Sequence, residues 1–408
     1  MAHQARETAY EIAVALARRE PAGLGETTDA ALYWAHVAQM FPEPWVEHAF
    51  ERAMASLADA IDGGVVAIGM FGGLTGAAWA AHVIDDAPDE PGSEAPDTLP
   101  PRVDAILVEA LSRKEWSGHY DLISGLVGFG VYFLARRRHA LARRGLRLTL
   151  DRLESMAEPA RGGLAWMTPA ALLPAHHRRT HPEGMIDLGL AHGVPGVVAF
   201  YSAILLAHVL PGHEEASLRR SLRSAVGFLE AHRQPQREHA AFDWCVAPGV
   251  AGRAARTAWC YGDPGVALAL LRASWALQDH ALYERALSLA RACATRPDDK
   301  CAVQDAGLCH GAAGLGHLFG RLGDATGDEV LRDGARRWFR NTLALRRSDG
   351  LAGFPAFETA DAPAGQGTYR ASPGILGGAA GVGLALMSAL GASAVWDQRL
   401  LLDVTPAG

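Results

Sequence analysis

A short glycine motif recurs six times along this chain of 408 residues. The motif is Gly-x-x-Gly, and its copies begin at Gly73, Gly125, Gly193, Gly262, Gly311 and Gly378. The first glycines of successive copies are 52, 68, 69, 49 and 67 residues apart (125 − 73 = 52, and so on). An apolar run follows each motif, and amphipathic segments lie between the runs. This pattern predicts helix-pair repeats, each with a buried helix and an outer helix.

Six such pairs predict an all-α fold, an (α/α)6 double-helical barrel or toroid. Small residues at the helix starts allow six backbones to crowd around one axis. Because every motif opens an inner helix, the motifs converge on one mouth of the barrel, where we expect the chemistry. We expect a single domain over residues 1–408, with surface insertions near 85–105 and 136–185. Residues 85–101 hold six acidic residues and five prolines, a composition typical of a solvated loop.

Charge and hydropathy exclude several classes of protein. Lys+Arg 38 against Asp+Glu 45 gives a net charge of −7, which offers no positive field to a nucleic acid. Arg6, Glu7 and Glu11 stand where a signal peptide needs an apolar core, so we expect a cytoplasmic protein. Three stretches without Asp, Glu, Lys or Arg, 63–84, 188–212 and 373–396, are rich in Gly and Ala. We interpret them as helices enclosed by other helices, not as transmembrane segments.

Cysteine and histidine mark two of the six motifs. Cys260 precedes the fourth copy, and Cys309 and His310 precede the fifth, so all three fall on the predicted mouth. Two thiolates and an imidazole leave the fourth position of a tetrahedral zinc ion open, as a catalytic zinc requires. The remaining cysteines, Cys245, Cys293 and Cys301, lie away from the motifs. We expect these three to be buried apolar residues.

Asp121 precedes the second motif and His192 precedes the third, so both can reach the same mouth. A carboxylate and an imidazole beside an open zinc position suit proton transfer, although each alone also fits an N-cap aspartate or a core histidine. Arg256 lies four residues before Cys260 and could stabilise a developing oxyanion or pair with Asp121. The basic stretch 136–147 and the histidine-rich stretch 176–181 are expected to be a solvated helix face and an exposed loop.

These motifs resemble the lanthionine synthetase C family, the cyclases of lanthipeptide biosynthesis. The resemblance is carried by Asp-Leu-Ile-Ser-Gly-Leu at 121–126, Gly-Leu-Ala-His-Gly-Val-Pro-Gly at 189–196, Arg-Thr-Ala-Trp-Cys-Tyr-Gly at 256–262, Cys-His-Gly-Ala-Ala-Gly at 309–314 and Trp-Asp at 396–397. It implies a double α-barrel that binds Zn²⁺ through Cys260, Cys309 and His310. It also implies that Asp121 and His192 handle a proton and that Arg256 and Tyr261 line the site.

The resemblance further implies the reaction. A cysteine thiolate of a dehydrated precursor peptide adds to the β-carbon of dehydroalanine or dehydrobutyrine and forms a thioether ring of lanthionine or methyllanthionine. We expect His192 to donate the proton to the α-carbon and Asp121 to hold or recharge it. No dehydratase or kinase-like domain precedes the barrel, so we expect a stand-alone cyclase that works with a separate dehydratase.

Other classes remain open from the sequence. A protein prenyltransferase also activates a peptide thiol, but its zinc set includes a carboxylate. A non-catalytic zinc-stabilised scaffold, or a glutathione-binding relative that adds small thiols to dehydrated residues, would use the same zinc residues. A glycoside hydrolase needs paired carboxylates, and only Asp121 and Asp263 supply one at the predicted rim.

Overall fold

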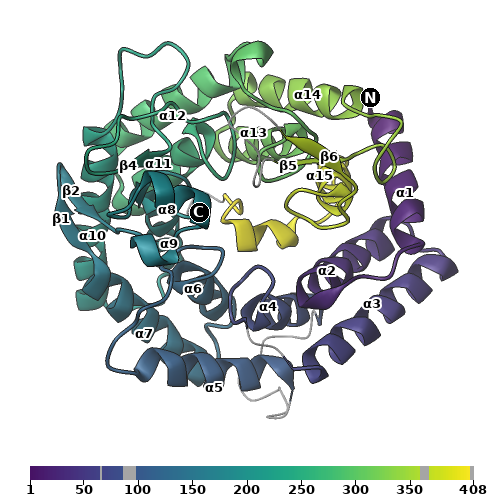
Figure 1. The fold of residues 1–408 in the computed structure, drawn as a ribbon, viewed down its shortest axis with the longest axis horizontal. Helices are drawn as coiled ribbons and strands as arrows, with labels where there is room; N and C mark the ends of the chain where they lie inside the picture. Colours follow the sequence, from purple (N-terminus) through teal and green to yellow (C-terminus); the bar gives the residue numbers. More distant parts are fainter. Residues whose placement is uncertain (65–66, 86–97, 359–366, 405–408) are drawn as a thin grey trace.

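The computed structural model describes residues 1–64, 67–85, 98–358 and 367–404 as a ring of helices in two layers (Figure 1). Each Gly-x-x-Gly motif opens an inner helix, and its first glycine is the N-cap of that helix. These inner helices are α4 (Leu74–Ile84), α6 (Leu126–Ala135), α9 (Val194–Ala207), α11 (Asp263–Leu277), α13 (Ala312–Thr326) and α15 (Ala379–Ala389). The predicted all-α double barrel is confirmed.

The ring contains one more inner helix than the motif predicts. Helix α2 (Gly23–Met40) has no Gly-x-x-Gly motif, yet it packs against α15 on one side and α4 on the other. Within the part of the chain that the structure describes, seven helices therefore form the inner layer, and the predicted number of six pairs is corrected to seven.

The outer layer follows a simple rule. Six outer helices each follow the inner helix on which they pack: α3 (Pro44–Asp62), α5 (Leu99–Ser112), α7 (Ala140–Met156), α10 (Gly212–Ala231), α12 (His280–Thr295) and α14 (Glu329–Ala344), within the described ranges. The seventh pair joins the two ends of the chain, because α1 (Ala2–Ala17) packs on α15. The ring is thus closed by contact between its N-terminal and C-terminal helices (Figure 1).

The predicted insertions need correction. Residues 99–112 and 140–156 form the outer helices α5 and α7, so the irregular excursion is confined to about 157–187, and residues 86–97 lie outside the described residues. Arg136 is also not part of a solvated face. It is 1% exposed, and its guanidinium lies 2.9 Å from the buried carboxylate of Asp104, so an ion pair joins the C-cap of α6 to the outer helix α5.

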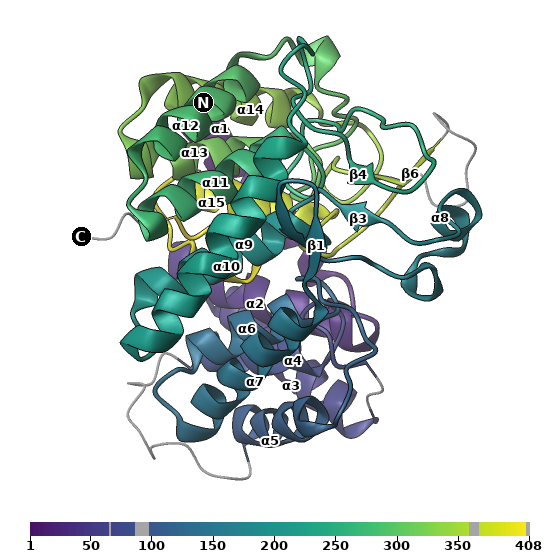
Figure 2. The same cartoon turned by 90° about the vertical axis from the view of Figure 1, so that its left-hand side faces the viewer.

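Among the described residues, three small two-stranded antiparallel sheets lie between the helices, in segments that lead toward the glycine motifs. Strand β1 (Glu158–Ala160) pairs with β2 (Gly163–Ala165), β3 (Ile186–Asp187) with β4 (Cys245–Val246), and β5 (Ala356–Glu358) with β6 (Thr368–Arg370). In the β3–β4 pair, Asp187 is opposite Cys245. Strands β3, β4 and β6 and the short helix α8 (Ala175–Thr180) lie on the same side of the ring (Figure 2).

The glycine loops are tightly folded and bonded to one another. A Cβ atom on Gly193 or Gly262 would overlap the carbonyl oxygen six residues earlier in its own loop, so only glycine fits there. Backbone hydrogen bonds then join neighbouring loops: Phe71 N to Ile123 O (3.1 Å), Leu122 N to Ala191 O (3.2 Å), Ala191 N to Cys260 O (3.3 Å), Cys260 N to Cys309 O (3.3 Å) and Cys309 N to Leu376 O (2.7 Å). The loops therefore form one connected floor of the mouth.

The C-terminal segment runs inside the ring, where it is drawn in yellow (Figure 1). Its 3₁₀ helix η3 (Val395–Leu400) is held by inner-layer residues. The Trp259 indole donates a hydrogen bond to the carbonyl of Leu400 (3.0 Å), and Arg399 bonds Asp29 of α2 (2.8 Å). Of the described helices, none is both long enough and apolar enough to cross a membrane.

Candidate metal centre and proton-transfer pair

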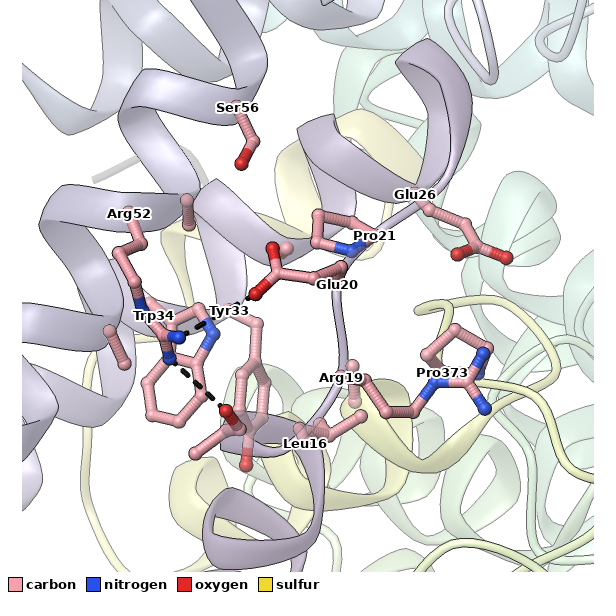
Figure 3. A pocket seen from close by; sticks show the side chains of 15 residues that line it. Leu16, Arg19, Glu20, Pro21, Glu26, Tyr33, Trp34, Arg52, Ser56 and Pro373 are labelled. Carbon is pink, nitrogen blue, oxygen red and sulfur yellow. Dashed lines mark hydrogen bonds and ion pairs between the residues drawn. The ribbon is translucent and has the colours of Figure 1, made fainter.

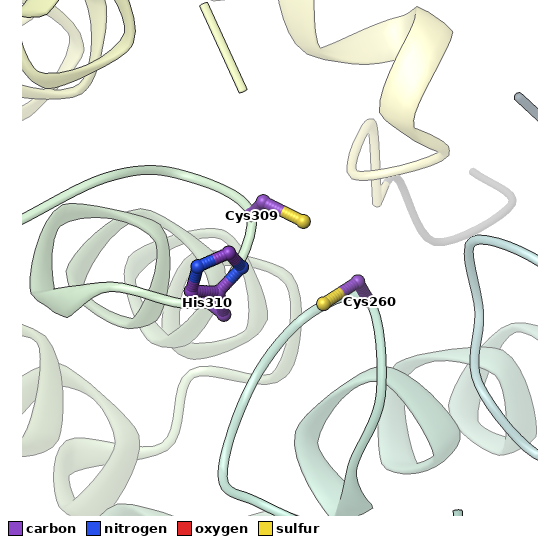
Figure 4. Close-up of side chains that lie close together, drawn as sticks. All are labelled: Cys260, Cys309 and His310. Carbon is purple, nitrogen blue, oxygen red and sulfur yellow. The ribbon is translucent and has the colours of Figure 1, made fainter. Parts of the chain in front are cut away.

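The structure brings together the three residues predicted to bind metal. The Sγ atoms of Cys260 and Cys309 and a ring nitrogen of His310 all lie within 4.8 Å of one another (Figure 4). Both cysteines stand two residues before the first glycine of their loops, and the loops are neighbours bonded through Cys260 N and Cys309 O. The repeat therefore delivers two thiols to one point from positions 49 residues apart (309 − 260 = 49).

The chemistry of this donor set fits a zinc ion. The neighbouring Cys309 thiol, His310 and the Arg256 charge hold the pKa of Cys260 well below its ordinary value, against burial, which raises it. The Cys309 pKa is in turn raised, because Cys260 lies beside it and the site is buried. The pair thus favours a single negative charge, and a bound divalent cation would allow both thiols to ionise.

His310 is also supported from behind. Its Nε2 atom lies 4.0 Å from Oδ2 of Asp305, which is 1% exposed. The carboxylate of Asp305 is fixed by two backbone donors, Gly307 N to Oδ1 (3.0 Å) and Phe357 N to Oδ2 (2.8 Å). A carboxylate close to the ring is a common partner of a metal-binding imidazole, and Asp305 lies near His310 without a hydrogen bond to it.

His192 and Asp121 meet on the same floor. His192 Nδ1 lies 2.5 Å from Asp121 Oδ2, and Asp121 Oδ1 accepts a hydrogen bond from Ser124 N (2.8 Å). The imidazole is 39% exposed whereas the carboxylate is only 6% exposed, so the ring faces the mouth and the carboxylate lies behind it. Burial acts to lower the His192 pKa, but the hydrogen bond and the charge of Asp121 outweigh it and raise the pKa above its ordinary value.

Aromatic rings extend from His192 toward the rim. Tyr261 stacks on His192 (ring centroids 5.8 Å apart, interplanar angle 24°), and Trp244 meets Tyr261 edge-on at 6.2 Å. His177 and His181 of the α8 region contact Trp244 at 5.0 and 5.2 Å. The expectation of an exposed loop over 176–181 is wrong, because residues 176–180 belong to the helix α8 and His181 is buried, with Nε2 3.6 Å from the Cys245 thiol.

Two buried aspartates near the site were missed by the sequence analysis. Asp187 and Asp305 each stand six residues before the first glycine of a loop, within the pattern Asp-x-Gly-Leu-x-His-Gly that occurs at 187–193 and at 305–311. Each accepts a hydrogen bond from the glycine two residues further on, Gly189 (2.6 Å) and Gly307 (3.0 Å). This longer repeat is the signal that could have found them.

The other candidate residues have structural roles. Asp263 is 1% exposed, pairs with Arg296 (2.6 Å) and accepts hydrogen bonds from the backbone of Ala241 and Phe242. It is therefore engaged in holding the start of α11. Cys245, Cys293 and Cys301 are buried and free, as expected, and burial raises the pKa of each thiol.

A pocket also lies apart from these residues, among α1, α2, α3 and α15 (Figure 3). Trp34 and Leu16 supply its apolar wall, and Arg52 crosses it to bond the Ala17 carbonyl (3.1 Å) and approach Glu20 (3.6 Å). None of the predicted site residues lines it.

The fold and this floor of cysteine, histidine and carboxylate define a class of protein. The family model of lanthionine synthetase C-like proteins matches residues 30–401. The chain therefore belongs to the lanthionine synthetase C-like family.

Two known proteins are similar to it. The nisin biosynthesis protein NisC of Lactococcus lactis subsp. lactis is 24% identical over 204 residues, which cover 48% of this chain and 47% of NisC. The aligned part thus spans about half the length of that curated relative. The solved structure of a nisin cyclase superposes with a TM-score of 0.74 over 97% of both chains at 17% identity, which supports the shared fold.

Proposed function

We propose that this protein is a zinc-dependent lanthipeptide cyclase that adds cysteine thiols of a dehydrated peptide to dehydroalanine or dehydrobutyrine. The observation that carries the proposal is the presence, on one floor of bonded loops, of the Cys260, Cys309 and His310 cluster and the His192 and Asp121 pair. Family membership and the likeness to nisin cyclase and NisC support it.

Cys260, Cys309 and His310 would hold the zinc ion. A zinc ion bound there supplies an open position at which a peptide thiol, with an ordinary pKa of about 8.5, is stabilised as a thiolate near neutral pH. Arg256 supports the same site, because its positive charge helps to lower the pKa of Cys260 and opposes the rise in the pKa of Cys309. It also provides a cation for the negative charge that develops on the substrate carbonyl.

His192 is the proton donor. The new S–C bond forms at the β-carbon as the carbon–carbon π bond breaks, and the electron pair moves to the α-carbon and its carbonyl. His192 then donates its proton to the α-carbon, and the proton released by the thiol restores the imidazolium, so no oxidant or reductant is needed. Asp121 behind the ring favours the protonated state, and the stacked Tyr261 fixes the plane of the ring.

The substrate is a peptide that a separate dehydratase has modified, and we place the reaction in the cytoplasm. A reaction between two residues of one chain requires an open approach to the proton donor, and the 39% exposure of His192 is consistent with this.

Metal content is the first test. Protein purified without added metal should contain one zinc per chain by elemental analysis, and the double variant Cys309→Ala, His310→Ala should contain almost none. The Cys293→Ala variant is the matched control, since Cys293 is a buried cysteine of α12 away from the cluster, and it should keep zinc. Wild-type zinc content in the double variant would remove the site.

Activity is the second test. A synthetic peptide with one dehydroalanine and one cysteine should lose its free thiol in the presence of the zinc-loaded protein, and fragmentation mass spectrometry should locate a ring. A parallel reaction offers glutathione and a peptide without cysteine. Addition of glutathione with no ring formation in the first reaction would favour the small-thiol alternative.

A further inference from the structure

Asp187 is a buried carboxyl group that the proposed mechanism does not use. It lies on β3, directly before the loop that carries His192, and is 1% exposed. Its Oδ1 accepts a hydrogen bond from Gly189 N (2.6 Å) and would overlap a Cβ atom on Gly193, so this oxygen fixes the turn below His192. Its Oδ2 is buried and has no hydrogen-bond partner among the described residues.

Comparison with Asp305, the equivalent aspartate of the loop that carries Cys309 and His310, shows that the Oδ2 atom of Asp187 is unusual. Asp305 occupies the same place in the second Asp-x-Gly-Leu-x-His-Gly segment, but both of its oxygens accept backbone hydrogen bonds, from Gly307 and Phe357. A buried carboxylate oxygen that accepts no hydrogen bond destabilises the fold, so Oδ2 of Asp187 requires an explanation beyond holding the loop.

Its neighbours point to the proton-transfer pair. The Asp187 carboxyl faces the Tyr261 hydroxyl, and its charge acts on His192, Asp121 and Tyr120. Tyr261 in turn stacks on the His192 ring. Asp187 therefore touches both the loop that bears the imidazole and the side chain that packs against it.

We propose that Asp187 is a positioning residue for the proton donor: Oδ1 holds the His192 loop, while the carboxyl group orients Tyr261 and keeps a negative charge close to the imidazole. The inference rests on the proposed function, because it assigns Asp187 a part in keeping His192 protonated for the transfer to the α-carbon.

Titration of the surrounding groups supports this role. Burial raises the pKa of Asp187 to about 7, so its charge appears near neutral pH, where an ordinary histidine loses its proton. His192 is faced by Asp121, Asp187, Tyr261, Cys260 and, from α8, His177. Burial and the neighbouring histidines lower the pKa of His177 to about 4, so His177 is neutral there and does not oppose the charge on His192.

The test measures the pKa of His192 directly, in zinc-loaded full-length protein labelled with ¹⁵N-histidine. The His192 signal is assigned as the one missing from His192→Asn. In Asp187→Asn, which keeps an oxygen for Gly189 N, the pKa of His192 should fall by roughly 0.5–1 unit. The alkaline limb of the pH–rate profile for cyclisation should move to lower pH by the same amount as the His192 pKa. The kcat should fall and the KM should change little. Asp187→Ser provides a second variant that still accepts from Gly189 N.

Asp305→Asn is the matched control, because it alters the equivalent residue of the other loop. It should leave the pKa of His192 unchanged, whatever it does to zinc affinity. An unchanged pKa of His192 in folded, zinc-loaded Asp187→Asn and Asp187→Ser would overturn the proposal, as would an equal shift in Asp305→Asn or loss of folding in both Asp187 variants. The titration needs no turnover, so failure of the wild-type protein to cyclise peptides would count against the proposed function alone.

Discussion

His192 and His310 occupy the same position in two loops of one repeat, yet their surroundings differ. Each stands one residue before the first glycine of its loop. His310 follows Cys309 and faces the Cys260 thiol, whereas His192 follows Ala191 and faces Asp121 at 2.5 Å. In the function proposed here, a thiol neighbour directs one imidazole to metal, and a carboxylate neighbour directs the other to proton transfer. The two proposed roles therefore differ because of single residues on a shared loop backbone.

Asp121→Asn should change the pH dependence of cyclisation. Asp121 raises the pKa of His192, so its charge keeps the imidazole protonated to higher pH. If His192 donates the proton, we expect activity to be lost as pH rises through that pKa. Without the charge, the alkaline limb of the rate profile should move to lower pH, while the rate well below the limb should change less. A limb in the same place would show that Asp121 does not set the protonation of His192. Rates measured across pH with a saturating peptide check this.

At the scale of single residues, the sequence predicts the site residues that are adjacent to the glycine motifs but not the buried aspartates that lie earlier in the same loops. Cys260, Cys309 and His310 stand next to a visible motif, and the closeness of neighbouring loops follows from the repeat. Asp187 and Asp305 stand six residues before the first glycine of their loops. They lie near the site only because each loop folds back so that its first glycine packs on the carbonyl group of that aspartate or of a residue close to it. The folding back of the loop is a property of the three-dimensional structure, and the spacing of residues in the sequence does not reveal it.

At the scale of helices, the motif predicts only those inner helices whose first residues pack tightly against the backbone of the preceding loop. A Cβ on Gly265 would overlap the Trp259 carbonyl, so the start of α11 demands glycine. The start of α2 is less crowded, because a Cβ on Gly23 would meet no atom within 4 Å and one on Gly25 would come no closer than 3.3 Å, to Gly72. A Cβ on either glycine at the start of α2 would not overlap a carbonyl group of its own loop, so α2 carries no Gly-x-x-Gly motif and the number of helix pairs predicted from the sequence is one too small. The same reasoning explains why α7 was assigned to an insertion, since outer helices carry no glycine signature.

The N-cap of α14 allows a prediction about stability. Asp328 accepts hydrogen bonds from Leu331 N (3.1 Å) and Arg291 Nε (2.7 Å). Burial acts to raise the Asp328 pKa, but these bonds hold it below its ordinary value. Asp328→Asn keeps the cap but loses the charge. It should lower the free energy of unfolding at pH 7 by less than about 1 kcal/mol, because Arg291 is 47% exposed.

The sign of the pH dependence provides the check. A carboxyl group with a lowered pKa stabilises the folded state above its unfolded value of about 3.9, and this stabilisation is lost as pH falls through the folded value. Thermal midpoints of the wild type and Asp328→Asn should therefore differ at neutral pH and converge in acid. A gap that persists in acid would mean that the substitution acts through packing.

At the scale of the whole molecule, the ring should unfold as one unit. Helix α1 packs on α15, and the C-terminal segment is bonded through Arg399 to Asp29 of α2 and through Leu400 to Trp259, so contacts cross the molecule between distant parts of the chain. We predict a single transition in which far-UV circular dichroism and tryptophan fluorescence coincide. Two separated transitions would contradict the expected single domain.

The most direct test of the central claim compares His192→Asn with the wild type. The amide can still hydrogen-bond to Asp121, but it cannot donate a proton near neutral pH. The variant should fold and hold one zinc per chain, yet form thioether rings about 10²–10⁴-fold more slowly. Ring formation at the wild-type rate in zinc-loaded His192→Asn would contradict the account, because proton donation would then not depend on this residue.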